Sequence, residues 1–428
     1  MNDLWTPLWR TNSVNQHPVL QGTLEVEFAI VGAGLEGLSL ALELARAKKT
    51  VAVLEAADIG NGATGASAGI VTAQLVRQTP DDVVRRLGRA QAELFLKLLA
   101  SAGARTFELI GARKRQVGAV NGGFIAPAKG AAGAERIATS AQQWLPFRSD
   151  LRVLSARETL ELTGAVGYSA ALLDPSGGCL NPLAYAEMLA SDARSLGAAI
   201  YTHSPVRCVT RSSSSWRVDT GHGSITARQV VLCANGGNAA LATSLRHSVL
   251  PLSVCQVATV PMSAKARQDI LPRGQSMTDL ETDVFSVRFD PEGRLITAYP
   301  MSSALKEPGR LNELVNRRLA AMLPSFLPTR LQHAWTGTAW LNSDLLPRAV
   351  DLDEGLFAIQ ACNGRGIAVS AAVGQSFGSW LTQGGNGPCA IPVQRPRSIP
   401  GYALVRYVPA VLMRLSLAAQ RLRRALAC

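Results

Sequence analysis

The stretch VEFAIVGAGLEGLSLALELARAKKTVAVLEA, residues 26–56, decides the fold of the region in which it lies. Its first apolar run, residues 26–31, is typical of a parallel strand that is buried on both faces. Residues 35–47 have the composition of a helix, and residues 50–54 form a second short apolar run. A strand, a helix and a second strand in this order predict a βαβ unit of a parallel sheet.

The residues between these elements predict a dinucleotide site. Gly32, Gly34 and Gly37 form the pattern G-x-G-x-x-G. The first glycine permits a tight turn, the second lets backbone approach a pyrophosphate, and the third lets the helix lie close to the strand. The first amides of the helix favour the charge of the phosphates. Glu55 closes the second strand, where a carboxylate binds ribose hydroxyls and repels a 2′-phosphate, so an ADP-ribose site is predicted rather than an NADP site.

The composition is that of an ordered globular chain. With 428 residues, of which 47% are hydrophobic and 17% charged, the chain exceeds what one core usually holds, so two interleaved domains are expected. The seven cysteines show no C-x-x-C spacing and the five histidines no H-E-x-x-H pattern, so neither a disulfide framework nor a metal site is predicted. The chain begins without a secretory leader and has no apolar run of about 18 residues, so a cytoplasmic location is expected.

More than half of the net charge of +12 comes from the end of the chain. Residues 391–428 contain seven arginines and no acid. Pro409 can occupy the first turn of a helix that runs to the end. At helical spacing, one side of this helix carries apolar residues and another carries arginines; these are Val411, Leu415, Leu422 and Leu426, and Arg414, Arg421 and Arg424.

Two interpretations of this tail remain. The simpler one is a helix docked on its own protein with its arginines in water. The other is a basic amphipathic helix in weak contact with an acidic membrane surface, which would make the protein peripheral to the inner membrane face. Nucleic acid is not expected as a partner, because the basic residues have neither interleaved aromatic residues nor a recognisable binding module.

The segment AADIGNGATGASAGIV, residues 56–71, indicates which nucleotide is bound. A nicotinamide dehydrogenase normally continues into a crossover helix here, whereas these small residues leave room for a planar ring, and Thr64 and Ser67 can hydrogen-bond to its edges. The segment resembles the one that passes the isoalloxazine in the D-amino-acid-oxidase-like family of FAD-dependent oxidoreductases. That family includes glycine and sarcosine oxidases and gamma-glutamylputrescine oxidoreductase.

The resemblance continues through most of the chain. PVLQG at 18–22 is similar to the approach to the first strand in the amine-oxidase branch. DPSGGCLNPLAYAEMLA at 174–190 is similar to a family segment that opens a helix, with Asn181 as its cap and Pro182 in its first turn.

Two further strands of the nucleotide fold follow. GAAIYTHSPVRCV at 197–209 looks like the family strand that ends at the adenine, which implies that the backbone of Val206 contacts the adenine edge. ARQVVLCANGG at 227–237 is similar to the family's strand and glycine turn, with Asn235 where threonine is commoner.

The segment LFAIQACNGRGIAVSAAVGQSFGSWL, residues 356–381, resembles the closing N-G-R-G-x-A motif of the amine-oxidase branch. Its helix, which begins near Gly366, would aim free amides at the pyrimidine end of the flavin and stabilise negative charge there. Asn363 would end the strand, and Arg365 would add a positive charge nearby.

The motifs and the resemblance together assign a set of residues to FAD, which is expected to be bound noncovalently because neither 56–71 nor 335–347 contains a His or Cys. The set is Gly32, Gly34, Leu35, Glu36, Gly37, Glu55, Ala56, Thr64, Gly65, Ala66, Ser67, Ala68, Gly69, Val206, Ala234, Asn235, Gly236, Asn363, Gly364, Arg365, Gly366 and Ile367.

The expected fold class is α/β, with a discontinuous Rossmann-like FAD-binding domain and a second α+β substrate domain built on a mainly antiparallel sheet. The FAD-binding domain is predicted to comprise 22–75, 175–240 and 335–385, and the substrate domain 76–174 and 241–334. Residues 1–21 form an N-terminal extension, and 386–428 a basic tail with an amphipathic helix. VNGGFIAPA at 120–128 and the hairpin VFSVRFDPEGRLITAYP at 284–300 are expected in the sheet that roofs the active site.

The segment WTGTAWLNSDLLP, residues 335–347, departs from the family pattern. By resemblance, the arginine that clamps a substrate carboxylate corresponds to Ala339, and Trp340 stands where proline is usual. Losing a bidentate guanidinium disfavours a simple α-amino acid and favours an amine or N-substituted amine. Trp335 and Trp340 form either a substrate wall or part of the core. Arg288 is the candidate replacement arginine, unless its side chain points to solvent.

Gln256 and Tyr299 are further candidates for substrate contact, because both fall on predicted strands of the roof. The predicted activity is oxidation of the C–N bond of an amine or amino-acid-like substrate by hydride transfer to flavin N5. The resulting imine would hydrolyse, and dioxygen or a quinone would be the electron acceptor. The alternatives are a peripheral membrane flavin dehydrogenase that passes electrons to quinone, and a flavin-binding protein with a degenerate pocket.

Overall fold

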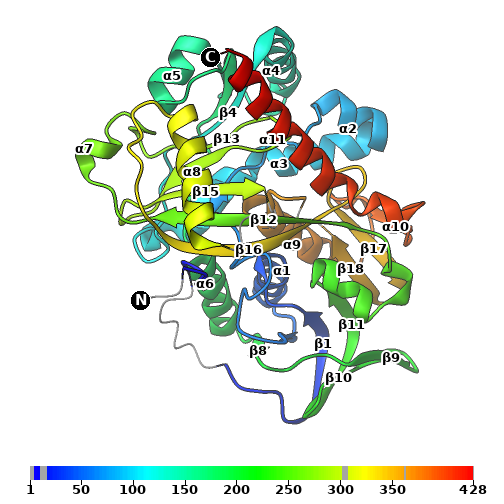
Figure 1. The fold of residues 1–428 in the computed structure, drawn as a ribbon. Helices are drawn as coiled ribbons and strands as arrows, with labels where there is room; N and C mark the ends of the chain where they lie inside the picture. Colours follow the sequence, from blue (N-terminus) through cyan, green and yellow to red (C-terminus); the bar gives the residue numbers. More distant parts are fainter. Residues whose placement is uncertain (1–3, 10–16, 301–306, 361–362, 428) are drawn as a thin grey trace.

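The computed structural model describes residues 4–9, 17–300, 307–360 and 363–427, and of residues 420–427 only the helical backbone. The chain folds around two large sheets, with helices on their outer faces (Figure 1). One sheet is mainly parallel and the other mainly antiparallel, which confirms the predicted α/β class with two kinds of sheet.

The first sheet has nine strands, in the order β19-β17-β18-β11-β1-β2-β8, and the hairpin β9–β10 pairs onto β11. Neighbouring strands from β18 to β8 run parallel. The strands are β1 (Gly22–Val31), β2 (Val51–Leu54), β8 (Ala199–Tyr201), β9 (Cys208–Ser212), β10 (Ser215–Asp219), β11 (Gly223–Leu232), β17 (Arg348–Asp353), β18 (Leu356–Gln360) and β19 (Val393–Gln394).

The second sheet has eight strands, in the order β16-β12-β15-β14-β13-β4-β6-β5, and only β13 and β4 pair in parallel. The strands are β4 (Phe124–Ala128), β5 (Arg152–Ser155), β6 (Ala170–Asp174), β12 (Leu250–Thr259), β13 (Ser276–Thr278), β14 (Ser286–Phe289), β15 (Leu295–Pro300) and β16 (Leu331–Leu341). A separate pair, β3 (Ile70–Val71) and β7 (Gly178–Cys179), lies outside both sheets. The predicted hairpin at 284–300 and the strand within 120–128 are confirmed.

Helices surround both sheets. They are α1 (Leu35–Arg46), α2 (Pro80–Leu87), α3 (Arg89–Ile110), α4 (Gly130–Trp144), α5 (Ala156–Thr163), α6 (Pro182–Ser195), α7 (Ala264–Arg267), α8 (Pro308–Met322), α9 (Gly366–Thr382), α10 (Tyr402–Val405) and α11 (Val408–Ala427), with short 3-10 turns at Gly111–Arg113, Asn235–Ala240 and Thr243–Leu245. The α6 cap forms as predicted: the Asn181 side chain accepts hydrogen bonds from the amides of Leu183 and Ala184.

Close backbone packing holds the core of the first sheet together. A Cβ atom at Gly37 would lie 2.1 Å from the carbonyl oxygen of Gly32, so α1 can approach β1 only because residue 37 is glycine. On the other side of α1, a Cβ at Gly374 of α9 would lie 2.3 Å from the carbonyl oxygen of Glu36. These contacts pack the first turn of α1 against the turn after β1 and against the middle of α9.

The packing does not follow every predicted domain boundary. Phe95, Leu99 and Phe107 of α3 belong to the same buried hydrophobic cluster as β1, α1 and α9, although 76–174 was assigned to the substrate domain. Strand β16 is hydrogen-bonded to β12 in the second sheet, although 335–385 was assigned to the FAD-binding domain. By sheet membership, that boundary moves from 335 to the end of β16, because strand pairing is a long-range contact that local pattern does not reveal.

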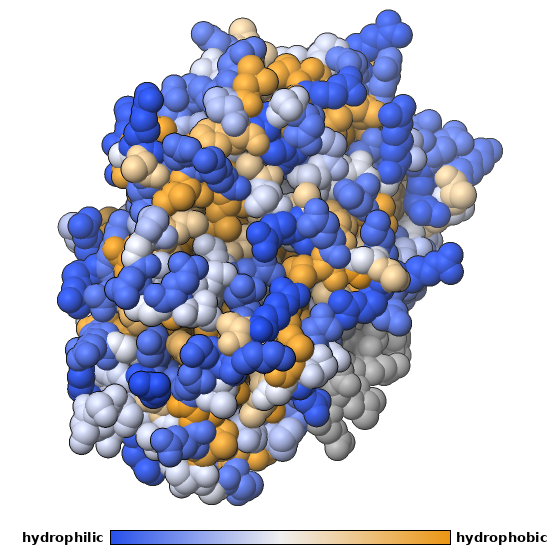
Figure 2. All heavy atoms as spheres, turned by 180° about the vertical axis from the view of Figure 1, so that it is seen from behind, coloured by the Kyte–Doolittle hydropathy of each residue, from blue (hydrophilic) through white to orange (hydrophobic). Residues whose placement is uncertain are grey.

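One face of the molecule, seen from behind the view of Figure 1, carries charged and polar side chains with apolar ones in small separate groups (Figure 2). Such a mixture is ordinary for a folded protein surface. By length and composition, one helix in the described chain, starting at Tyr402 and reaching Ala419, is apolar enough to cross a membrane, and only 6% of that stretch is buried.

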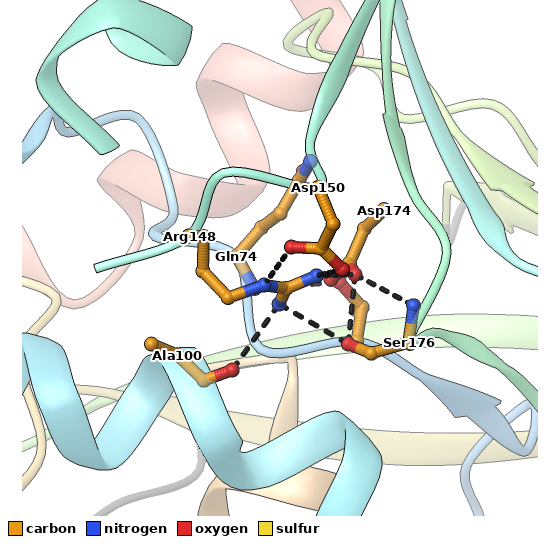
Figure 3. Close-up of polar contacts among 7 residues, drawn as sticks. Gln74, Ala100, Arg148, Asp150, Asp174 and Ser176 are labelled. Carbon is orange, nitrogen blue, oxygen red and sulfur yellow. Dashed lines mark hydrogen bonds and ion pairs between the residues drawn. The ribbon is translucent and has the colours of Figure 1, made fainter. Parts of the chain in front are cut away.

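A buried ionic network joins α3 to the segments that follow α4 and β6 (Figure 3). The Arg148 guanidinium donates to Asp174 at 2.7 Å, to Asp150 at 2.6 Å, and to Ser176 Oγ and the Ala100 carbonyl at 3.2 Å each. Burial acts to lower the pKa of Arg148, but the two carboxylates outweigh it and raise the pKa above its usual value. The side chains of Arg148 and Asp174 are only 11% and 4% exposed, so this ion pair is largely screened from water.

Replacing this arginine should therefore destabilise the fold. We expect Arg148→Ala to lower the free energy of unfolding by about 3 kcal/mol, because it leaves the buried Asp174 carboxylate without its cation. Denaturant unfolding followed by circular dichroism measures the difference. Arg157→Ala is the matched control, since Arg157 pairs with Glu161 at the surface, with the arginine 88% exposed, and its loss should leave the free energy of unfolding nearly unchanged. Equal losses in the two variants would contradict the stabilising role of the network.

Candidate functional site

A cavity of about 560 Å³ lies between the two sheets. The segments that follow the carboxyl ends of β1, β2, β11 and β18 form one side of it, the position at which open parallel sheets bind ligands. Strands β12, β15 and β16 form the other side, and α11 contributes Pro409, Leu412 and Met413. Its volume is in the range of small-molecule sites.

Two helices begin at this cavity without a side-chain cap. The N-cap residues of α1 and α9, Gly34 and Arg365, make no capping hydrogen bond through a side chain. Of the first amides of α1, that of Leu35 donates to Thr64 Oγ1 at 3.3 Å. Both helix N-termini thus present amide dipoles to the same space, an arrangement that favours negatively charged ligand groups.

The Glu55 carboxylate is held at the end of β2. It accepts hydrogen bonds from the amides of Ala33 at 2.8 Å and Ala57 at 3.1 Å, and it lines the cavity. This position, beside the glycine turn, is where a carboxylate can receive ribose hydroxyls.

The segment from Gly60 to Gly69 is held by three side chains from distant parts of the chain. Its successive carbonyl oxygens at residues 66, 67 and 68 accept hydrogen bonds from Trp335 Nε1 at 3.1 Å, Trp9 Nε1 at 2.9 Å and Arg288 Nε at 2.5 Å. A Cβ atom at Gly69 would lie 2.2 Å from the carbonyl oxygen of Leu180, so only glycine fits there. The segment is therefore a rigid wall rather than a flexible loop.

Comparison with known proteins identifies the family of this chain. The sequence from residue 27 to residue 380 matches the family described as DAO, FAD dependent oxidoreductase. The chain belongs to this family.

Its relatives include the gamma-glutamylputrescine oxidoreductase of Escherichia coli K12, 25% identical over 370 residues and covering 85% of each chain. A glycine oxidase of Geobacillus kaustophilus is 26% identical over 360 residues, which is 82% of this chain and 92% of that one. The crystal structure of glycine oxidase from Geobacillus kaustophilus superposes with a TM-score of 0.68 at 23% identity, over 86% of this chain and 96% of that chain. The L-proline dehydrogenase from P. horikoshii superposes with a TM-score of 0.70 at 17% identity, over 85% and 95%.

The protein is thus an FAD-dependent oxidoreductase that acts on an amine or amino-acid-like substrate, as predicted. The cavity fits the cofactor on its own features: two uncapped helix N-termini for the charged groups, a fixed carboxylate for a ribose, and a wall of small residues for a flat ring.

Most residues assigned to FAD line the cavity. These are Gly32, Gly34, Leu35, Glu36, Glu55, Thr64, Ala66, Ser67, Ala68, Gly69, Ala234, Asn235, Asn363, Gly364, Arg365, Gly366 and Ile367. Gly37, Ala56, Gly65, Val206 and Gly236 do not line it. Contact of each residue with FAD remains a prediction.

The residues that do not line the cavity have other positions. Gly37 and Gly65 pack against the backbone carbonyls of Gly32 and Gly60, and Gly236 lies under the Trp340 indole. Ala56 is exposed beside Glu55. Val206 packs against the hydrophobic cluster on the other face of the parallel sheet.

The residues predicted to contact the substrate differ in whether their side chains face the cavity. Gln256 and Trp340 line the cavity, and Gln256 is nearly buried with no hydrogen-bond partner for its Oε1 in the described part of the chain. Tyr299 borders the cavity, but its ring packs into the hydrophobic cluster on the opposite face of the sheet, with the Arg318 guanidinium 5.7 Å from its centroid. The cause is register: Tyr299 pairs with Cys255, and successive side chains of a strand point to opposite faces.

The placement of Arg288 differs from the role predicted for it. Its side chain is fully buried and does not line the cavity. The guanidinium donates to the carbonyls of Ala68 and Leu180 and lies 4.9 Å from the centroid of the Trp9 ring. Arg288 therefore supports the 60–69 wall instead of facing a substrate, and it is not solvated either.

Arg365 is the cation that the described cavity wall presents from the start of α9. The Arg365 guanidinium donates to Gln74 Oε1 at 3.5 Å and lies 5.5 Å from the centroid of the Phe124 ring, and no carboxylate of the described residues pairs with it. Burial lowers the pKa of Arg365 to about 10, so the group stays cationic near neutral pH. It is available to a negatively charged group within the cavity.

Sequence reasoning missed the contribution of both chain ends to this site. Trp9 lies in the segment predicted as an extension, yet it is buried and anchors Ser67. The two tryptophans in LWTPLW, residues 4–9, were the available signal, since tryptophan seldom occurs in a solvated tail. No local signal indicated that α11 would reach the cavity.

Glu36 is a buried carboxyl group at the start of α1. It lines the cavity, and its Oε1 has no hydrogen-bond partner among the described residues. Burial raises the pKa of Glu36 to about 8. The pKa of the neighbouring Cys233 thiol is also raised, by its own burial and then by Glu36. At neutral pH Glu36 is thus protonated and does not oppose a phosphate charge.

We expect FAD affinity to fall as the pH rises above about 8, by up to tenfold per pH unit, because ionised Glu36 places a negative charge at the α1 N-terminus. Glu36→Gln should remove this dependence. The holoprotein is diluted at a series of pH values, and the fluorescence of the FAD that is released gives the affinity at each pH.

A second measurement follows from the same group. The folded-state pKa lies above the ordinary value of 4.5, so between these two values the folded chain holds the additional proton. The free energy of unfolding of the cofactor-free protein should therefore fall as pH rises through this window, and less so in Glu36→Gln. Parallel pH profiles of the wild type and Glu36→Gln in both measurements would show that Glu36 is not the titrating group.

Proposed function

We propose that the protein oxidises the C–N bond of an amine or N-substituted amine rather than that of a simple α-amino acid. The observation that carries this proposal is the wall formed by β12 and β16. At the position where the family resemblance implies a carboxylate-binding arginine, the wall presents Ala339, paired with Leu252, and both line the cavity. An apolar wall suits an aliphatic amine and leaves a carboxylate without a bidentate partner.

Gln256 supplies the polar contact on this wall. Its Oε1 has no hydrogen-bond partner among the residues that the structure describes, so it can receive the N–H of a neutral amine and orient the nitrogen. Burying such an acceptor unpaired is unfavourable, which supports a ligand group at this point. The indole of Trp340, which is paired with Pro251 further along the same strands, packs over Gly236 and also lines the cavity.

The carboxyl groups of the described cavity lining are all committed to other contacts or remote from this wall. Glu55 is held by backbone amides, and Asp283 pairs with Arg318 and accepts from Ser416. No histidine of the described chain lines the cavity. The substrate must therefore arrive as the neutral amine, whose lone pair assists loss of hydride from the adjacent carbon without a protein base.

When bound, FAD supplies the hydride acceptor. The substrate leaves as an imine, which water hydrolyses to a carbonyl compound and ammonia or an amine. The α9 N-terminus and Arg365 provide positive potential where negative charge develops at that end of the cavity. Dioxygen or a quinone then takes the electrons.

The test is an anaerobic titration of the purified holoprotein with amines, N-methylated amines and D- and L-amino acids. We expect amines or N-substituted amines to bleach the flavin absorbance, with an efficiency that rises with pH as the substrate amine loses its proton. Gln256→Leu should raise KM about tenfold through the lost hydrogen bond. Reduction by α-amino acids in preference to every amine would overturn the proposal.

A gain-of-function variant tests the wall directly. Ala339→Arg should place a guanidinium at the apolar wall and lower KM for carboxylate-bearing amines about tenfold, while raising it for unsubstituted amines. Ala339→Leu is the matched control for side-chain volume. If Ala339→Arg and Ala339→Leu change the two substrate classes alike, the carboxylate site lies elsewhere, with Arg365 as its cation.

A further inference from the structure

Helices α10 and α11 lie beyond the residues that match the FAD-dependent oxidoreductase family, since the match ends at residue 380. They are therefore features of this chain that the shared reaction does not explain. Residues 391–428 carry seven arginines and no acid, which makes the segment strongly basic.

The inner face of α11 is docked on the second sheet, beside β12 and β15 (Figure 1). Met413 is 5% exposed and borders the cavity, and Leu417 packs against the hydrophobic cluster of that sheet. Ser416 Oγ donates to Asp283 Oδ1 at 3.2 Å. These contacts confirm the simpler interpretation of the tail for one face of the helix.

The outer face of the same helix is apolar and exposed. Val408, Val411 and Leu415 follow helical spacing and are 44–62% exposed. Leu412, which lines the cavity, is 45% exposed and lies at the edge of this strip. Leu404 and Tyr407, just before the helix, extend this surface. Leu422 and Leu426 continue the same spacing in the sequence, but their side chains lie outside the described residues, as do those of Arg421 and Arg424. A continuous exposed apolar strip of this kind marks an interaction surface.

The charge of the segment decides between occupants of this strip. A second copy of the chain would bring two sets of arginines together, which is unfavourable. Nucleic acid would leave the apolar side chains in water. A membrane surface with acidic head groups satisfies both features, because the apolar strip enters the acyl boundary while arginines contact the head groups.

We propose that α11 lies in the surface of an anionic lipid membrane, with Val408, Val411 and Leu415 turned into the lipid and its inner face still docked on the second sheet. The helix does not span the bilayer, because the contacts of Met413, Ser416 and Leu417 hold its other side on the protein.

Vesicle flotation of the full-length holoprotein tests this proposal. Vesicles contain phosphatidylcholine alone or equal parts of phosphatidylcholine and phosphatidylglycerol. We expect the protein to float with the anionic vesicles only, and the bound fraction to fall as salt is raised. The double variant Val411→Asp/Leu415→Asp should reduce binding at least about tenfold. Leu327→Asp, at an apolar residue that is 69% exposed elsewhere on the surface, is the matched control and should bind as the wild type does.

Hydrogen exchange of the wild type, with and without anionic vesicles, gives a second readout that needs no variant. We expect slower exchange across residues 402–419 on vesicle binding. Absence of flotation, unchanged binding of the double variant, or protection confined to another surface would each overturn the proposal. Concentration-dependent dimers that Leu415→Gln abolishes would assign the strip to a second copy instead. None of these readouts depends on the amine substrate.

Discussion

The close approach of α1 to its neighbours is the constraint on which the rest of the structure depends. Glycine at residue 37 lets the helix contact the turn after β1, and glycine at residue 374 lets α9 lie against α1 from the other side. Both helices begin at the same cavity, so the dipoles of their N-termini act together on one ligand. Any side chain at either glycine would separate the helices and divide the site.

The second requirement is a stiff wall for the flat part of the cofactor. Trp9, Arg288 and Trp335 each donate to a different carbonyl of the 66–68 backbone, and they come from the N-terminal segment, β14 and β16. The same three residues pack on one another, with Trp9 edge-on to Trp335 and below Arg288. The wall follows β2 of the first sheet, whereas β14 and β16 belong to the second sheet, so cofactor binding and the packing of the two sheets are expected to be coupled.

Charge is distributed unevenly around the cavity. Arg365 is a half-buried cation without a carboxylate partner in the described structure, while Glu36 is kept neutral by burial. The potential at the two helix N-termini is therefore positive at neutral pH, which suits phosphates and a ring that gains negative charge. The wall from β12 and β16, in contrast, offers an amide and apolar side chains, as expected for a neutral amine substrate.

The sequence by itself determined the class of fold and the dinucleotide turn, because these depend on local spacing of glycines and apolar runs between residues 26 and 56. The resemblance of residues 56–71 and 356–381 to a flavoenzyme family then implied the cofactor. Tertiary structure alone decided which face of a strand each candidate occupies: pairing register turned Gln256 to the cavity and the Tyr299 ring away from it. Tertiary structure also places the Arg288 guanidinium against the Ala68 carbonyl of the 60–69 segment, and it places α11 at the cavity. Such contacts join residues hundreds of positions apart, and no local pattern encodes which distant backbone a side chain will meet.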